Sequence, residues 1–196
     1  MENKIPLSQG SPLLQRETLL LHSCCAPCSS SVLERLAAYY DITLYYYNPN
    51  IMPSAEYEKR LSEQRRLLTL FPEPSDTELI EGEYDNSAFL KAVKGLENEP
   101  EGSGVRCEKC IEMRLDKTAA LARERGFDFF ASTLSVSPHK NAALINKILT
   151  QTGAKYNIKP LCEDFKKKDG YRRGVELSNK YGLYRQKYCG CVFAGI

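Results

Sequence analysis

The sequence predicts an α/β fold in which a mostly parallel β-sheet carries helices on both faces. Short apolar runs rich in β-branched and aromatic residues alternate with longer segments whose apolar residues recur at helical spacing. Pro, Gly, Asn and Ser concentrate in the connections between them and mark turns. Because strands that alternate with helices pair in parallel through right-handed crossovers, we expect a Rossmann-like sheet.

The first strand–loop–helix unit organises this prediction. The apolar run Thr18–Leu21 leads into the polar loop His22–Cys28, and apolar residues at helical spacing then continue to Ala38. Pro27 suits a turn, and Ser29–Ser31 offer hydroxyl oxygens for a helix N-cap. Ligands of open α/β sheets bind at the carboxyl ends of the strands, and this loop presents three thiols there.

The later elements follow from the same two periodicities. Further strands are predicted at Ile42–Tyr47, Thr77–Glu81, Phe127–Leu134 and Tyr156–Leu161. Further helices are predicted at Ser54–Phe71, Ser87–Leu96, Cys110–Gly126, Asn141–Thr152 and Val175–Tyr181. Gly126 and Gly153 are expected to end two of these helices. The acidic, aperiodic segment Gly95–Val105 is the best candidate for a mobile loop.

Composition predicts one globular domain. The 196 residues are 42% hydrophobic and 27% charged, enough apolar material for a core. We expect a polar leader at residues 1–17 and a single α/β metalloenzyme domain at residues 18–196 with a cysteine-bearing C-terminal tail. No apolar run approaches the roughly 18 residues that span a bilayer, and the start lacks a signal-peptide pattern, so we expect a cytoplasmic protein.

Charge is distributed unevenly along the chain. Residues 139–190 contain 12 Lys and Arg against 4 Asp and Glu, a net charge of +8, whereas the remaining residues carry −6. Three tyrosines in this basic quarter, Tyr171, Tyr184 and Tyr188, are interleaved with Arg and Lys. Cations with stacking surfaces are typical of single-stranded nucleic-acid binding, and a solvated helical face is the alternative.

Eight cysteines dominate the chemistry of the sequence. Seven of them fall into three groups: Cys24, Cys25 and Cys28; Cys107 and Cys110; Cys189 and Cys191. A disulfide framework is not the expected use of thiols in a cytoplasmic chain, and inert core thiols would scatter along the sequence. The grouping therefore predicts metal or redox chemistry.

The Cys107–Cys110 pair has the spacing at which two sulfurs at a helix start bind one metal or cluster. A CxxC pair alone is ambiguous among zinc, iron–sulfur and redox uses. With Cys24 and Cys25 in the strand-end crevice, a four-thiolate site assembled from two loops becomes reasonable. We favour an iron–sulfur cluster over zinc, because adjacent cysteines suit clusters bound by irregular loops.

The other candidates carry less weight. Cys189–Gly190–Cys191 is a tight pair that can form a strained, readily reduced disulfide, and its two thiols can store two electrons or hold a second metal. Cys28 either supplements or replaces Cys24 as a ligand or is packed, and Cys162 is expected to be a core thiol. We expect His22 to be a structural histidine rather than a proton donor, and His139 to be a cap or an anion contact. No phosphate-binding glycine loop follows the first strand, so ATP use is not expected.

Six motifs, in order, carry a resemblance that spans residues 18–191. They are His22–Cys28, Tyr47–Ile51, Arg106–Cys110 with Arg114 and Leu115, Ser137–Asn141, Asp164–Lys167 and Tyr184–Cys191. In these motifs the chain resembles the QueH family of epoxyqueuosine reductases. The resemblance implies a HUP-type fold and a cobalamin-independent reductase for the last step of queuosine synthesis, which converts epoxyqueuosine in the anticodon stem-loop of tRNA to queuosine.

The resemblance also implies a ligand set. A [4Fe–4S] cluster is expected on Cys24, Cys25, Cys107 and Cys110, with Cys189 as an alternative ligand. Cys189 and Cys191 are implied to be a catalytic redox-active pair or the ligands of an additional iron. The electron donor is not identified by the sequence. One alternative function is a zinc-stabilised tRNA-binding module without redox activity. Another is a tRNA sulfur-transfer enzyme, but such an enzyme needs the phosphate loop that this sequence does not display.

Overall fold

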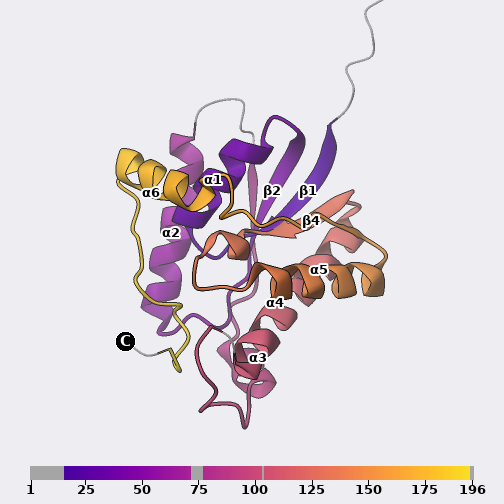
Figure 1. The fold of residues 1–196 in the computed structure, drawn as a ribbon, viewed down its shortest axis with the longest axis vertical. Helices are drawn as coiled ribbons and strands as arrows, with labels where there is room; N and C mark the ends of the chain where they lie inside the picture. The colour runs from indigo at the N-terminus through magenta and orange to yellow at the C-terminus, as the bar shows by residue number, and fades with distance from the viewer. Residues whose placement is uncertain (1–15, 72–76, 103, 195–196) are drawn as a thin grey trace, which may run out of the picture.

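A computed structural model describes residues 16–71, 77–102 and 104–194, which form a parallel sheet surrounded by helices (Figure 1). The strands are β1 Glu17–His22, β2 Tyr40–Tyr46, β3 Glu78–Glu81, β4 Phe129–Ser132 and β5 Lys159–Pro160. The helices are α1 Ala26–Leu36, α2 Ser54–Leu70, α3 Asn86–Ala92, α4 Val105–Arg125, the 3₁₀ turn η1 Thr133–Val136, α5 Ala142–Tyr156 and α6 Gly170–Tyr181. The predicted α/β class is confirmed.

The strand order β3-β2-β1-β4-β5 places β1 between two parallel neighbours. The chain moves outward from β1 to β2 and β3, then returns so that β4 pairs with the other edge of β1. His22 and Ser132, the last residues of β1 and β4, lie side by side in the register. A crevice opens outside the carboxyl ends of strands at such a switch in order, and the loop that begins with Ser23 enters it.

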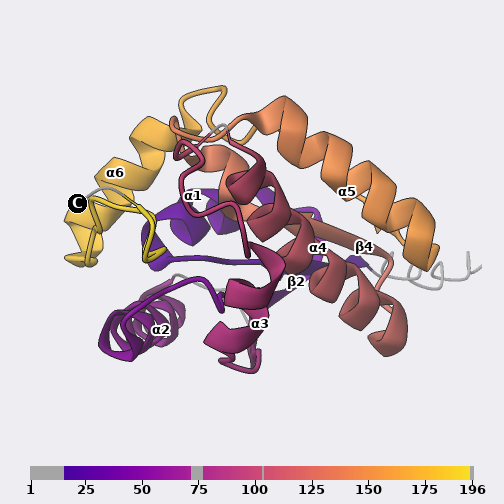
Figure 2. The ribbon, with the colours of Figure 1, turned by 90° about the horizontal axis from the view of Figure 1, so that it is seen from below.

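Alternation along β1 divides the core between the two faces of the sheet. Leu19 and Leu21 belong to a cluster with residues of α1 and α2, whereas Leu20 belongs to a cluster with α4 and α5. All three leucines are fully buried, and burying each side chain contributes about 1.5–3 kcal/mol. Helix α6 packs on α1, and Figure 2 shows α4 and α5 together, away from α1, α2 and α6.

Helix α1 begins earlier than the serines suggested. Cys25 is its N-cap residue, Pro27 lies in its first turn, and no side chain caps its amino end. Ser29–Ser31 are therefore buried inside the helix, and the prediction that they provide the N-cap is wrong. A proline in the first turn lacks only an N–H that would have no helical partner, so the helix starts at the loop itself.

Other boundaries differ in both directions, and β4 and β5 are shorter than the predicted strands Phe127–Leu134 and Tyr156–Leu161. Helix α4 begins at Val105 rather than Cys110 and ends at Gly126, which has φ +75° as predicted for a terminating glycine. Helix α5 runs through Gly153 and ends at Asn157 in the left-handed region. Of the predicted leader, residues 1–15 lie outside the described residues. None of the helices in the described ranges is long and apolar enough to span a membrane.

Gly153 lies where α5 touches the chain that returns to β5. A Cβ atom at this position would lie 2.8 Å from Ile158 O and 3.0 Å from Pro160 Cδ. We predict that Gly153→Ala lowers the free energy of unfolding by about 1–3 kcal/mol, through overpacking against backbone. An exposed helical glycine would instead gain about 1 kcal/mol on the same change. Urea titration measures the sign, and a stabilised variant would contradict the packing described.

Candidate active site

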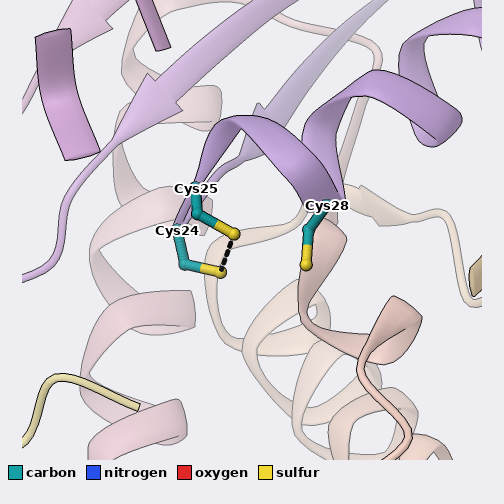
Figure 3. Close-up of side chains that lie close together, drawn as sticks. All are labelled: Cys24, Cys25 and Cys28. Carbon is teal, nitrogen blue, oxygen red and sulfur yellow. Dashed lines mark hydrogen bonds between the residues drawn. The ribbon is translucent and has the colours of Figure 1, made fainter. Parts of the chain in front are cut away.

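Three sulfurs gather where β1 ends and α1 begins (Figure 3). The Sγ atoms of Cys24, Cys25 and Cys28 all lie within 4.8 Å of one another, and those of Cys24 and Cys25 are 3.9 Å apart. Within the described ranges, no other set of three or more His, Cys, Asp or Glu residues brings its ligand atoms so close. Cys28, whose role the sequence left open, thus belongs to this group.

A buried polar network fixes the loop that carries these thiols. Ser23 Oγ donates to Gln64 Oε1 of α2 at 2.6 Å, and Ser29 Oγ donates to the same oxygen at 2.9 Å. Asn48, which follows β2, donates its Nδ2–H to Ser23 O at 2.9 Å. All four side chains are 0% exposed. Buried polar groups that are left unpaired cost about 1–3 kcal/mol each, so this network holds the loop in one conformation.

The remaining clustered thiols line an adjacent small cavity that is open to solvent on one side. Cys107 and Cys110 reach it from the first turns of α4, and Cys189 and Cys191 reach it from the C-terminal tail. The other lining residues are Phe89, Arg106, Ile111, Arg114 and Lys140. The predicted pairing of Cys107 with Cys110 on one helix start is confirmed, although their sulfurs form no close group with Cys24 and Cys25 in this structure.

Both cysteine groups lie at helix amino ends. Cys25 is the N-cap of α1, and Cys107 is the third residue of α4, whose N-cap is Gly104. The unpaired N–H groups of a first helical turn carry partial positive charge and stabilise thiolates. The Gly102 N–H also donates to Cys107 Sγ at 3.2 Å. The amino ends of α1 and α4 thus both lie at cysteines, and one further backbone N–H contacts Cys107 Sγ.

Arg114 connects the two groups electrostatically. Its side chain is 2% exposed and donates to Asn48 Oδ1 at 3.2 Å and to Cys110 O at 3.4 Å. Burial lowers the pKa of Arg114, but negative charge on Cys110, Cys189, Cys24 and Cys107 more than offsets this, and the pKa is raised. The guanidinium thus lies within the field of sulfurs from both cysteine groups.

The pKa values of Cys24, Cys25 and Cys28 depend on the contacts among their three sulfurs. Hydrogen bonds from Cys25 and Cys28 hold the pKa of Cys24 well below its ordinary value. The same contact with Cys24 raises the pKa of Cys25 to about 12, and the pKa of Cys28 is raised as well. Burial raises the pKa of Cys110 to about 11. One negative charge is therefore favoured at Cys24, and further charges require a cation or metal.

The tail is held in place by α2. Arg60, 2% exposed, forms an ion pair with Glu56 at 2.6 Å and donates to Cys189 O at 2.8 Å and Tyr188 O at 3.2 Å. Gly190 has φ +97°, and a Cβ there would lie 3.1 Å from the Arg60 guanidinium nitrogens. Glycine is thus required between the two cysteines by both backbone conformation and contact.

The surroundings of His22 and Cys162 test the predictions made for these two residues. His22 is fully buried, with Nδ1 3.0 Å from Ser132 Oγ and Nε2 3.1 Å from Tyr47 O, so the structural interpretation is confirmed. Cys162 is exposed, and the prediction of a core thiol is wrong, because Thr150 and Asn146 at the surface of α5 hold its sulfur. All eight cysteines are free thiols.

The sequence reasoning missed the polar residues that support the thiols. Arg60 and Gln64 lie within the predicted helix Ser54–Phe71 and Arg114 lies in one of the six motifs, but the sequence assigns none of them a role at the site. Each is a polar residue at a helical position where an apolar, core-facing residue is expected. A polar residue at such a position is the sequence signal that could have identified them. Lys140, whose Nζ lies 3.9 Å from Cys189 Sγ, gave no such signal because it lies in a loop.

Thiols that gather at the carboxyl ends of parallel strands define an α/β protein built for cysteine-based metal or redox chemistry. Residues 19–195 match the family model described as Epoxyqueuosine reductase QueH. This chain belongs to the QueH family of epoxyqueuosine reductases and is an oxidoreductase of queuosine biosynthesis.

Curated relatives agree with this assignment, and a solved structure shares the fold. The epoxyqueuosine reductase QueH of Staphylococcus epidermidis is 47% identical over 186 residues, which cover 93% of this chain and 78% of that protein. The Thermotoga maritima protein of the same name is 40% identical over 180 residues, 90% of each chain. A crystal structure of a predicted tRNA methyltransferase subunit from Methanocaldococcus jannaschii has a TM-score of 0.52 at 17% identity, covers 84% of this chain and 74% of that chain, and shows the fold alone.

His22 predicts a specific acid sensitivity. Burial, and secondarily the charge of Arg114, lowers the pKa of His22 to about 3 from 6.5. Between these values the unfolded chain binds a proton that the folded protein excludes, so stability falls by up to about 1.4 kcal/mol per unit as pH drops below 6.5.

We predict that His22→Asn is less stable than the wild type at pH 7, because it loses a buried hydrogen bond, and loses less stability between pH 6.5 and 4. Urea titrations across this range measure both slopes. Equal slopes for the two proteins would show that His22 is not held neutral.

Proposed function

We propose that this chain reduces epoxyqueuosine at the wobble position of tRNA to queuosine. The epoxide oxygen leaves as water after two electrons and two protons are added, and a carbon–carbon double bond forms in the five-membered ring. The family assignment supports the reaction, and two groups of thiols, three at the end of β1 and four along the cavity, support the delivery of electrons there. A zinc-stabilised binding module without redox chemistry is not favoured, because the relatives are named reductases.

The residues of the crevice fit an iron–sulfur cluster. Cys24 and Cys25 from the β1–α1 loop and Cys107 and Cys110 from α4 are proposed as ligands, with Cys28 as an additional candidate from its position. The donor set is sulfur-rich, and the Gly102 N–H donates to Cys107 Sγ, a type of contact that is common at cluster sites. A bound [4Fe–4S] cluster would supply electrons one at a time beside the cavity.

Cys189 and Cys191 are proposed as the second redox element. They line the same cavity as Cys107 and Cys110, and Arg60 and Met52 hold the turn between them through backbone hydrogen bonds. As a dithiol, the pair releases two electrons and two protons when it closes to a disulfide. The same thiols could instead hold an additional iron, which would supply Lewis-acid polarisation of the epoxide oxygen.

The surface that meets tRNA is proposed to lie along the tail. Four of the 12 cations in the basic quarter, Lys155, Lys166, Arg172 and Arg173, form ion pairs with carboxylates. Arg185 and Lys187, by contrast, are exposed and form no ion pair within the described chain. They alternate with Tyr184 and Tyr188, whose rings lie against Lys59 and Arg60 and anchor the strand-like tail.

Cysteine substitutions test the two proposed thiol roles separately. Cys107→Ser is expected to lose both the brown chromophore of the anaerobically purified protein and the reduction of epoxyqueuosine in tRNA. Cys191→Ser is expected to keep most of the chromophore and lose turnover by at least about a hundredfold, because an electron-pair donor is removed. Cys162→Ser, which changes an exposed cysteine outside the cavity, is the matched control and should match the wild type.

Iron, zinc and sulfide analysis accompanies the absorption spectra. Normal reduction of epoxyqueuosine-tRNA by both Cys107→Ser and Cys191→Ser would contradict these assignments. A colourless wild-type protein with stoichiometric zinc would contradict the cluster and support the binding-module alternative.

Charge substitutions test the tail surface. The double variant Arg185→Gln with Lys187→Gln is expected to bind the anticodon stem-loop more weakly and to flatten the plot of log affinity against log salt. Each lost phosphate contact changes that slope by about 0.7–0.9. The control removes two exposed cations at the far end of α4, Arg123→Gln with Arg125→Gln, and should leave the slope unchanged. If the two double variants show the same dependence of affinity on salt, the RNA does not bind at Arg185 and Lys187.

A further inference from the structure

The thiol cavity is lined by three cations without acidic partners. Arg106, Arg114 and Lys140 all contribute to its wall. Arg106 and Arg114 are 3% and 2% exposed, and none of the three forms a salt bridge with Asp or Glu within the described residues. Arg106 donates to Glu97 O and Phe193 O, which are neutral carbonyl acceptors. The cavity therefore has an excess of positive charge.

Neutral hydrogen-bond acceptors do not balance buried charge. Arg114 contacts Asn48 Oδ1 and Cys110 O, which satisfy N–H groups but carry no net charge. An uncompensated buried cation costs several kcal/mol, so buried charges are normally paired or placed beside a metal site. The other walls of the cavity are Phe89 and Ile111, which are apolar. The sulfurs are thus the only cavity-lining groups that can supply negative charge.

Two of the cations face sulfurs from different directions. Lys140, in the loop after η1, places its Nζ 3.9 Å from Cys189 Sγ of the tail. Arg114 is almost fully buried on α4, one helical turn after Cys110. Asn48 accepts a hydrogen bond from Arg114 and donates one to Ser23 O, and so joins Arg114 to the loop of Cys24. One cation therefore lies at the tail cysteines and the other between the two cysteine groups.

We propose that Arg114 and Lys140 are fixed counter-charges that allow several cysteines of this site to be thiolates together and to hold a thiolate-bound metal. Both are positioning residues, because they act through the sulfurs and need not touch substrate. Only the identity of the metal rests on the proposed function. The electrostatic energy is largest at short range, so each cation serves mainly the sulfurs nearest to it.

Cobalt binding to the reduced metal-free protein tests this inference without turnover. Sulfur-to-Co²⁺ charge-transfer absorption reports thiolate ligands and, by anaerobic titration, their affinity. Arg114→Gln and Lys140→Gln are each expected to bind Co²⁺ at least about tenfold more weakly than the wild type. Arg114→Lys, which keeps the charge, should recover most of the affinity. Arg123→Gln is the control, since this exposed α4 residue lies about 14 Å along the helix from Arg114.

A second readout uses the protein loaded with its cluster. Loss of a nearby positive charge makes reduction less favourable, so the midpoint potential of Arg114→Gln should shift to a more negative value, and Arg114→Lys should restore it. Circular dichroism and thermal unfolding verify that each variant is folded. If Arg114→Gln does not fold, Lys140→Gln decides, because the Lys140 side chain is in a loop and contacts Cys189 Sγ.

Wild-type Co²⁺ affinity in the folded charge-removing variants would overturn the counter-charge role and leave the proposed reductase function intact. Wild-type protein that shows no thiolate-bound Co²⁺ and loads no cluster would overturn the proposed cofactor, and this inference with it.

Discussion

The site depends on the hydrogen bonds that tie the loop after β1 to its neighbours. Gln64 Oε1 accepts hydrogen bonds from the hydroxyls of Ser23 and Ser29, and Asn48 donates a hydrogen bond to Ser23 O. Gln64 belongs to α2 and Asn48 to the segment after β2, so two later parts of the chain fix the loop. Because the groups are fully buried, any other loop conformation would leave donors or acceptors unpaired. The close approach of three sulfurs, which is unfavourable once more than one is charged, is sustained by this network.

Charge explains why the second cysteine group lies where it does. Helix α4 brings Cys107 and Cys110 to the cavity at its amino end and Arg114 one turn later, so thiols and counter-charge are presented by one rigid element. Asn48 contacts both Arg114 and the backbone of Ser23 and thereby joins α4 to the β1–α1 loop. A displacement of α4 would therefore disturb both cysteine groups at once. Arg114 thereby connects the two cysteine groups electrostatically, although their cysteines come from segments far apart in sequence.

Much of the fold could be predicted because local patterns agree with it. The leucines at positions 19–21, the aromatic run in β2 and the Gly126 helix end each carry a local signal that the structure bears out. The boundaries failed where tertiary contact decides, as at Gly153, where close approach of Ile158 O outweighs the usual helix-ending role of glycine. Cysteine spacing identified the three thiol groups but not their neighbours, since Arg60, Gln64 and Lys140 gain their roles only when distant segments meet. The ligand roles of individual cysteines stay predictions.

The tail shows how a segment without regular structure can be positioned as firmly as a helix. Arg60 of α2 binds the carbonyls of Tyr188 and Cys189, and Arg106 of α4 binds the carbonyl of Phe193. The turn at Gly190 is thus held from both sides by guanidinium groups, each of which is almost fully buried. An arginine is suited to this because its planar fork donates to two carbonyls in a fixed geometry, which a lysine cannot do. The redox role proposed for Cys189 and Cys191 would require the pair to keep its position relative to the other thiols of the cavity in either redox state. Backbone anchoring by α2 and α4 achieves this while leaving both sulfurs free to react.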